Sequence, residues 1–323
     1  MSARPRPSRV VRYHERGGPE VLLFETVEVA PPAAGEVRVR FAAGGLNPVD
    51  AKIRSGRSRI VLTLPVDVGR EFSGVVEAVG AGVDSVAIGD AVFGSIPQGA
   101  FADWVIAPAS VIARVPEAVP LEVAAGLALA GQTAWDALDS QGLASGDTIV
   151  VSAAAGGVGG ILSQLAVGRG IRVIGTAGPA NHDWLRERGV EPVLYGDGLR
   201  ERLATAAPDG ITAVFDQAGA ETIEAALALG VPPERINTIA TDASAYGVRG
   251  VGRGAVHPPT LDALAALVAA SALDVPIAAS FPLSEVREAF AFLEAGHLRG
   301  KVVVTADADE DTAPTTAAGA PTR

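Results

Sequence analysis

The chain has 323 residues, which is enough for one large domain or two domains of roughly 100 to 200 residues each. Hydrophobic residues make up 48% and charged residues 20%, a balance that excludes an intrinsically disordered chain. The 26 basic and 37 acidic residues give a formal charge of −11, the wrong sign for a protein that binds nucleic acid by neutralising phosphates.

Metal and membrane sites find little support in the sequence. The chain has no cysteine, which excludes disulfides, thiolate nucleophiles and sulfur-ligated zinc or iron–sulfur sites. Its four histidines lie far apart, so we expect no metal site. The N-terminal stretch lacks the apolar run of a signal peptide, and the most apolar region, 148–167, is interrupted by glycines. We therefore expect a cytoplasmic protein that spans no membrane.

The first third of the chain is rich in short β-type runs separated by turn residues. Such runs occupy residues 36–41, 74–79, 91–93 and 104–107. Short strands with Gly, Pro and Asp between them predict an antiparallel, barrel-like unit.

From about residue 121 the pattern changes to alternating strands and helices. A strand at 148–153, a glycine cluster, a helix at 161–168 and a strand at 171–176 form a predicted βαβ unit. The alternation continues with strands at 192–194, 213–216 and 236–240 and helices at 198–206 and 221–229. Several such units predict a doubly wound parallel sheet.

The last folded segment runs from about residue 259 to 305. It contains a predicted helix at 261–271, a second helix capped by Ser284 and ended by Gly296, and a strand at 302–305. Residues 306–323 have no apolar period and predict a flexible tail.

The glycine cluster Ala153 to Gly159 is the clearest motif, because it follows an apolar strand and opens a helix. A dinucleotide pyrophosphate needs a tight turn, bare backbone and helix N-terminal N–H groups, which Gly156, Gly157 and Gly159 supply. The alternative is that small residues only let the helix pack closely on the strand.

The end of the next strand indicates which dinucleotide is bound. An NAD-preferring protein places Asp or Glu there to hold the ribose 2′-hydroxyl, but residues 175–178 contain no acid. This absence favours NADP. The nearest basic candidates for its 2′-phosphate are His182 and Arg186.

Several separated segments, in order, carry a resemblance to a known family. They are residues 13–22, 45–50, 53–56, 69–80, 89–93, 99–105, 130–135, 153–159 and 294–303. Together they resemble the zinc-free medium-chain dehydrogenase/reductases of the quinone oxidoreductase-like branch; zinc-dependent relatives carry a cysteine in the active-site segment. The resemblance implies an α/β protein with a GroES-like β-rich substrate domain (1–125 and 260–305), an inserted Rossmann doubly wound parallel sheet domain (126–259) and a tail (306–323).

The resemblance also implies site residues. The expected cofactor contacts are Asn47, Thr133, Ala155, Gly156, Gly157, Val158, Gly159, Thr176, Tyr195 and Lys301, and the expected catalytic residues are Asn47, Lys52 and Thr133. Asn47 would contact the nicotinamide and the substrate, with a simple Asn-Pro turn as the alternative. Thr133 would approach the nicotinamide, or else bond its own helix backbone. Asp50 also matches the motif, as either a site residue or a structural one.

Two positions depart from the family pattern. Asn181 stands where relatives often have a lysine for the 2′-phosphate, which weakens the expectation of strict NADPH preference. Lys52 stands where many relatives have an aromatic residue. Its ammonium would stabilise an enolate oxygen or deliver a proton, or it lies at the rim of the cleft.

The implied function is hydride transfer from NADPH to a small quinone or α,β-unsaturated carbonyl compound (an enone), without zinc, by a homodimer that binds neither nucleic acid nor membrane. An enoyl-thioester reductase is the close alternative. A non-redox lyase or cyclase, or a nucleotide-sensing module on the same fold, is the alternative from another class. A structural protein of the lens-crystallin type is a more remote one.

Overall fold

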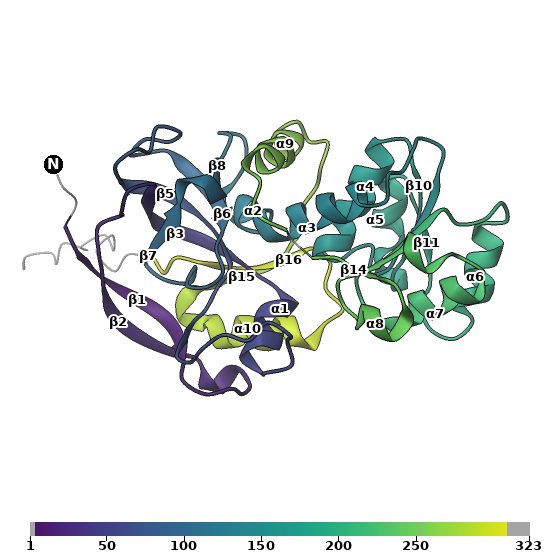
Figure 1. Ribbon diagram of the computed structural model, residues 1–323, viewed down its shortest axis with the longest axis horizontal. Coiled ribbons are helices and arrows are strands. Elements are labelled where there is room, and N and C mark those ends of the chain that lie inside the picture. The colour runs from purple at the N-terminus through teal and green to yellow at the C-terminus, as the bar shows by residue number, and fades with distance from the viewer. Residues whose placement is uncertain (1–3, 253, 309–323) are drawn as a thin grey trace, which may run out of the picture.

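The computed structural model describes residues 4–252 and 254–308. Figure 1 shows two lobes, a β-rich lobe at the left and a lobe of alternating strands and helices at the right. The yellow strand β16 (Lys301–Thr305) runs from near their junction into the β-rich lobe. The C-terminal part of the chain therefore returns to the lobe in which the chain began.

The β-rich lobe is built mainly from antiparallel strands. Its main sheet has the order β15-β16-β3-β5-β6-β8, with β7 also paired to β3, and only β15 and β16 run parallel. A smaller sheet has the order β2-β1-β4. The strand bounds are β1 (Arg6–Tyr13), β2 (Leu23–Val29), β3 (Glu36–Leu46), β4 (Val66–Asp67), β5 (Glu71–Val79), β6 (Ala91–Ser95), β7 (Trp104–Pro108), β8 (Ile112–Arg114) and β15 (Ile277–Pro282).

The second lobe is a parallel sheet in the order β11-β10-β9-β12-β13-β14. Its central strand β9 is buried on both faces, which explains the continuous apolar run of its sequence. The bounds are β9 (Thr148–Val151), β10 (Arg172–Thr176), β11 (Val190–Val193), β12 (Ala213–Asp216), β13 (Ile236–Thr238), β14 (Arg249–Gly250), α4 (Gly157–Gly168), α5 (His182–Glu187), α6 (Leu199–Ala206), α7 (Ala220–Ala228) and α8 (Ala243–Tyr246). The doubly wound sheet predicted from the sequence is confirmed.

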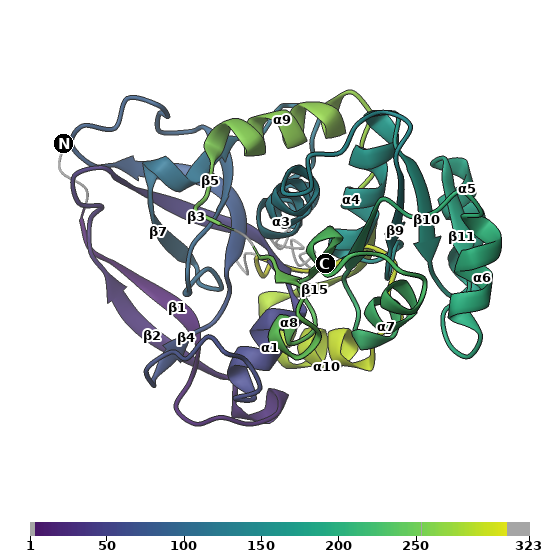
Figure 2. The same ribbon diagram turned by 45° about the vertical axis from the view of Figure 1, so that its right-hand side comes forward.

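Helices fill the junction between the lobes. The remaining helices are α1 (Pro48–Arg54), α2 (Leu121–Ala125), α3 (Ala128–Asp139), α9 (Pro258–Ala269) and α10 (Val286–Ala295). In Figure 2 α3 lies beneath α9 and beside α4, and α3 packs against both. Its alanine-rich sequence suits this place, because small side chains let helices approach closely on several sides.

Several element boundaries differ from the sequence prediction by a few residues, and two of the differences have a clear cause. The glycine-cluster helix begins at Gly157 rather than at residue 161, because the glycines themselves form its first turn. The prediction that Ser284 caps the last helix was wrong. Ser284 lies within a 3₁₀ turn, Leu283–Glu285, and α10 follows with Glu285 as its N-cap. The Ser284 hydroxyl donates instead to Asp307 Oδ1, at 2.8 Å.

The division of the chain into domains stays a prediction. The sheets group residues 6–114 with 277–305, and residues 148–250 with one another, but they do not fix the boundaries at 125–126 and 259–260. Residues 306–308 carry no helix or strand. The rest of the predicted tail, 309–323, lies outside the described residues.

Candidate active site

The glycine turn lies at the carboxyl end of β9. Ala153 takes a positive φ of 47°, which is uncommon for a residue with a side chain, and its carbonyl accepts the Gly156 N–H at 2.8 Å. A Cβ on Gly159 would lie 2.3 Å from that same carbonyl oxygen. Gly159 therefore has to be glycine for α4 to start this close to the strand.

The N-terminus of α4 is suited to binding an anion. Its N-cap is Gly156, which has no side chain to satisfy the first N–H groups of the helix. These N–H groups and the helix dipole favour a phosphate. The predicted contacts Ala155 to Gly159 thus lie together at this helix N-terminus, and their contact with a cofactor stays a prediction.

The glycine turn is joined directly to the start of β16. The Gly300 N–H donates to the Ala155 carbonyl at 2.8 Å, and Gly156 and Gly300 form an isolated parallel bridge. The next residue, Lys301, packs its aliphatic stem against the turn: a Cβ on Gly157 would lie 2.9 Å from Lys301 Cδ. Bare backbone at Gly157 therefore makes room for the stem of Lys301.

Lys301 ends in a buried polar cluster with Glu71 and Asn47. Its side chain is 3% exposed and that of Glu71 is fully buried. Lys301 Nζ donates to Glu71 Oε1 at 2.6 Å and to Asn47 Oδ1 at 2.5 Å. Asn47 Nδ2 donates in turn to the same Glu71 oxygen at 2.8 Å, so each charge has a close partner.

Long-range pairing brings this cluster together. In the antiparallel register of β16 with β3, Val302 lies opposite Leu46, which puts Lys301 next to Asn47. The side chain of Glu71 passes over β3 at Gly45, where a Cβ would lie 2.2 Å from Glu71 Oε1. We call Asn47, Glu71 and Lys301 the lysine cluster.

Helix α3 is anchored on the lysine cluster. The Leu129 N–H, in its first turn, donates to Glu71 Oε2 at 2.6 Å. One turn later the buried Thr133 hydroxyl donates to the Leu129 carbonyl at 2.7 Å. The Thr133 hydroxyl therefore bonds its own helix backbone, which was the alternative to a contact with the nicotinamide. A contact between Thr133 and the nicotinamide stays a prediction.

The remaining predicted residues lie at other places. Lys52 is exposed on α1, outside the lysine cluster, and its ammonium makes no hydrogen bond or ion pair to any described residue. Tyr195 is 41% exposed, and its hydroxyl lies 3.4 Å from His297 Nδ1 and close to Gly178. Thr176 is buried at the end of β10. Tyr195 and His297 thus lie close to Gly178, in the segment 175–178 that is expected to meet the 2′-phosphate.

Two site residues were missed by the sequence prediction. Glu71 lies in a quoted motif, and an acid in such an apolar segment was a signal of a buried charge. No feature of the sequence indicated that Gln217 belongs to the site. It follows β12 at the carboxyl edge of the sheet, where such folds bind nucleotides, and among the described residues its buried side-chain amide has no hydrogen-bond partner for either Nε2 or Oε1. A buried amide without partners at that edge fits a bound dinucleotide.

Asp50 accepts the Asn47 N–H at 2.9 Å and is buried beside the lysine cluster. Burial raises the pKa of Asp50 to about 6, against the Asn47 hydrogen bond and the charge of Arg70, which lower it.

This shift predicts a pH-dependent stability. Because the folded state binds the Asp50 proton more tightly than the unfolded state, this carboxyl destabilises the fold as the pH rises from about 4 through 6. The Asp50→Asn variant keeps an acceptor for the Asn47 N–H without the charge. We expect its unfolding free energy in urea to exceed that of the wild type at pH 7.5, on the order of 2 kcal/mol, and the gap to shrink at pH 4.5. A gap that stays constant between pH 4.5 and 7.5 would contradict this origin.

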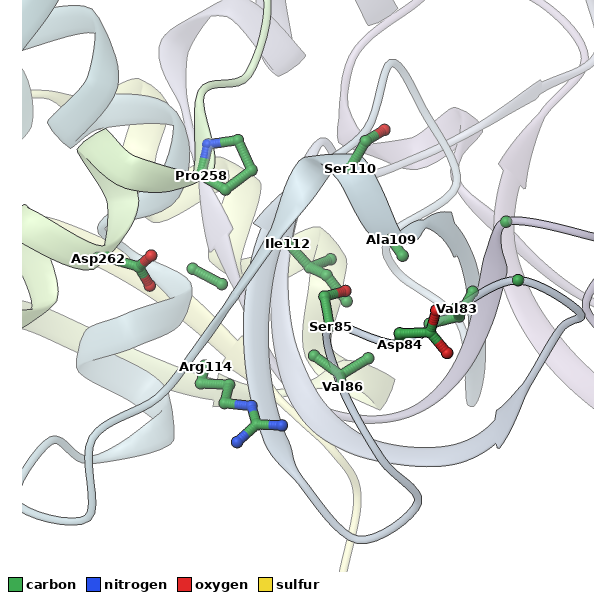
Figure 3. Close-up of a pocket in the computed structure, with 13 residues that line it drawn as sticks. Val83, Asp84, Ser85, Val86, Ala109, Ser110, Ile112, Arg114, Pro258 and Asp262 are labelled. Atoms are coloured by element: carbon green, nitrogen blue, oxygen red, sulfur yellow. The ribbon is translucent and has the colours of Figure 1, made fainter.

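A wide hollow elsewhere contains none of the predicted site residues. Its volume is about 610 Å³, and it lies between the β8 region, the loop after β5 and the start of α9. Figure 3 shows its polar side chains, among them Asp84, Arg114 and Asp262, spread along an open rim rather than directed at one point. We do not assign it to the active site.

No described group of side chains resembles a metal centre. Within residues 4–252 and 254–308, no set of three or more His, Asp or Glu residues is placed to hold a metal ion. In the same part of the chain, none of the helices is long and apolar enough to cross a membrane.

The two lobes and the glycine turn between them define the class of the protein. Residues 33–117 match the family model of the alcohol dehydrogenase GroES-like domain, and residues 189–304 match that of the zinc-binding dehydrogenases. The chain belongs to the medium-chain dehydrogenase/reductase family, in its quinone oxidoreductase-like branch. The family and fold class predicted from the sequence are confirmed.

Individual proteins of the family resemble the chain over half of its length or more. The chain is 33% identical to a probable quinone oxidoreductase of Schizosaccharomyces pombe over 68% of this chain and 67% of that protein. It is 36% identical to the quinone oxidoreductase of Rattus norvegicus, over 53% of each chain.

Solved structures match over nearly the whole chain. The quinone oxidoreductase of Coxiella burnetii has a TM-score of 0.84 and 28% identity, covering 94% of this chain and 100% of that one. A mycobacterial protein solved in complex with NADPH has a TM-score of 0.80 and 31% identity, covering 92% and 99%.

Proposed function

We propose that this protein is a zinc-independent oxidoreductase that uses NADPH to reduce a quinone or an α,β-unsaturated carbonyl compound. The observation that carries the proposal is the direct connection between the N-terminus of α4 and the lysine cluster. Gly157 packs on Lys301, and Lys301 bonds Asn47 and Glu71. A dinucleotide on the glycine turn would lie immediately beside a rigid polar cluster.

The residues present fit a dinucleotide. The first N–H groups of α4 would hold the pyrophosphate, and the unpartnered Gln217 amide would bond the ligand at the same sheet edge. Tyr195 and His297 would contact the adenosine 2′-phosphate, since residues 175–178 contain no acid to repel it. When bound, the reduced nicotinamide supplies a hydride, which adds to the acceptor while its oxygen gains the electron pair and then a proton from water.

The lysine cluster would act by positioning. Both polar atoms of the Asn47 amide are engaged, Oδ1 by Lys301 and Nδ2 by Glu71, so its orientation is fixed. Glu71 also bonds the first turn of α3, the helix that carries Thr133. The cluster would therefore hold the β-rich lobe, α3 and the glycine turn in one arrangement, as hydride transfer requires.

The donor set supports a reaction without zinc. The chain has no cysteine, and Asn47 lies in the active-site segment where zinc-dependent relatives carry one. Lys52 as a proton donor and a homodimeric state stay predictions.

Nucleotide titration tests the proposal. We expect NADPH to quench the fluorescence of the protein's three tryptophans with a Kd at least about tenfold below that of NADH, since a charge-assisted phosphate contact is worth about 1.5–3 kcal/mol. With NADPH bound, 9,10-phenanthrenequinone or cyclohex-2-enone should be reduced, in the presence of a chelator as well. Failure of both nucleotides to bind would contradict the proposal and favour a non-redox function. Preferential reduction of crotonyl-CoA would favour the enoyl-thioester reductase.

A further inference from the structure

A small pocket lies next to the lysine cluster, on the side of Asp50. Its volume of about 20 Å³ is room for one oxygen atom or one water. Tyr13, Asp50 and Arg70 contribute polar groups to its lining. The other lining residues are the buried apolar side chains of Ile53, Val66 and Val68, together with Gly69, Leu62, Pro97, Gln98 and the half-buried Asp67, whose carboxylate pairs with Arg12.

Two hydrogen-bonding atoms of this pocket lack partners. Tyr13 is 2% exposed, and neither its hydroxyl nor the buried Nε of Arg70 makes a hydrogen bond to any described residue. Burial raises the pKa of Tyr13, so its hydroxyl stays protonated and can donate. Buried polar groups are nearly always paired, which means that two donors here lack an acceptor.

Two lining residues of the pocket, Asp50 and Arg70, are connected directly to the lysine cluster. Arg70 is the neighbour of Glu71 in the chain, and Asp50 bonds the backbone of Asn47. Arg70 is thus joined directly to the lysine cluster, whereas Tyr13 lines the pocket from β1. A group seated in the pocket would be held both from strand β1 and from the residue that precedes β5.

We propose that Tyr13 and Arg70 bind the carbonyl oxygen of the hydride acceptor. This inference rests on the proposed function and adds the residues that recognise the substrate. As hydride adds to the acceptor, the electron pair moves to this oxygen. The Tyr13 hydroxyl and the Arg70 guanidinium then stabilise the developing negative charge before a proton arrives from water.

The lining also indicates the class of acceptor. The pocket accommodates a single oxygen, and its lining residue Leu62 belongs to a loop that exposes the apolar residues Ile60, Val61 and Leu64. A volume of about 20 Å³ has room for one oxygen but not for both oxygens of a carboxylate group. The pocket is therefore suited to a neutral, largely apolar ketone, enone or quinone.

The Tyr13→Phe variant tests this assignment. Because the hydroxyl has no partner in the protein, its removal should not lower stability, and the ring keeps its packing. We expect an unchanged NADPH Kd and a kcat/KM for cyclohex-2-enone about 10- to 100-fold lower than in the wild type. Tyr246→Phe is the matched control, because it also deletes a tyrosine hydroxyl, one that bonds Glu224 on the other lobe; its kcat/KM should match the wild type.

A vibrational measurement separates carbonyl binding from catalysis. In the complex with NADP⁺ and cyclohex-2-enone, where no hydride is available, the carbonyl stretch should lie at lower wavenumber in the wild type than in Tyr13→Phe. Equal wavenumbers together with equal kcat/KM would overturn the inference. A wild type that reduces no acceptor would instead contradict the proposed function, and the carbonyl shift would still decide whether Tyr13 binds the ligand.

Discussion

Replacing Gly157 by aspartate is expected to weaken NADPH binding by at least about 100-fold while the protein still folds. A side chain here would stand at the N-terminus of α4, in the space proposed for the pyrophosphate, and its Cβ would lie 2.9 Å from Lys301 Cδ. The added carboxylate would also repel the phosphates. Because Lys301 Cδ belongs to a flexible stem, small shifts relieve that contact, and the cost falls mainly on binding.

The measurement is a fluorescence titration of the variant with NADPH, accompanied by circular dichroism and thermal unfolding. Gly168→Asp is the matched control, since it makes the same change at the other end of α4, where a Cβ meets nothing within 4 Å. Its NADPH Kd should stay within about threefold of the wild type. Unchanged NADPH affinity in Gly157→Asp would remove the glycine turn from the binding site.

Replacing Lys301 by methionine is expected to lower the free energy of unfolding by about 3–5 kcal/mol. The change keeps most of the aliphatic stem but removes the cation from the fully buried Glu71 carboxylate. A buried charge that has lost its partner costs far more than an exposed one. Asn47 Oδ1 loses its donor at the same time, so the site loses order as well.

The control is Lys52, the only other lysine of the chain, which allows the same substitution to be made at an exposed position. Lys52→Met, at an exposed position, should change the unfolding free energy by no more than about 0.5 kcal/mol in urea denaturation. A Lys301→Met/Glu71→Leu double variant should recover part of the loss, because no unpaired charge remains buried. If Lys301→Met and Lys52→Met prove equally stable, the buried ion pair does not stabilise the fold.

Local sequence patterns were sufficient to predict the parallel sheet and the glycine turn. The strand Ala213–Asp216 was predicted with the bounds that the structure has, because a buried parallel strand reads as a short apolar run between turns. The glycines at 156, 157 and 159 were recognisable because their neighbours in sequence are also their neighbours in space. The start of α10 was misjudged because a serine that resembles an N-cap bonds Asp307 instead.

The charged interior could not be predicted in this way. Lys301 was expected to contact the cofactor, a role that stays a prediction, but nothing in the sequence indicated that its ammonium is buried against Glu71, 230 residues earlier in the chain. The Tyr13–Arg70 pocket likewise joins the end of one strand to the start of another. No period or spacing in the sequence relates such positions.

The sequence by itself therefore determined the class of fold and the place of the glycine turn, because these follow from hydrophobic periodicity and the steric needs of neighbouring residues. The family was indicated by the resemblance of its ordered motifs. The tertiary structure alone decided which polar side chains meet. The register of β16 against β3 places Lys301 beside Asn47, and burial then requires each polar group there to find a partner. Pairing across sheets depends on the whole packed core, so it is set only when the chain has folded.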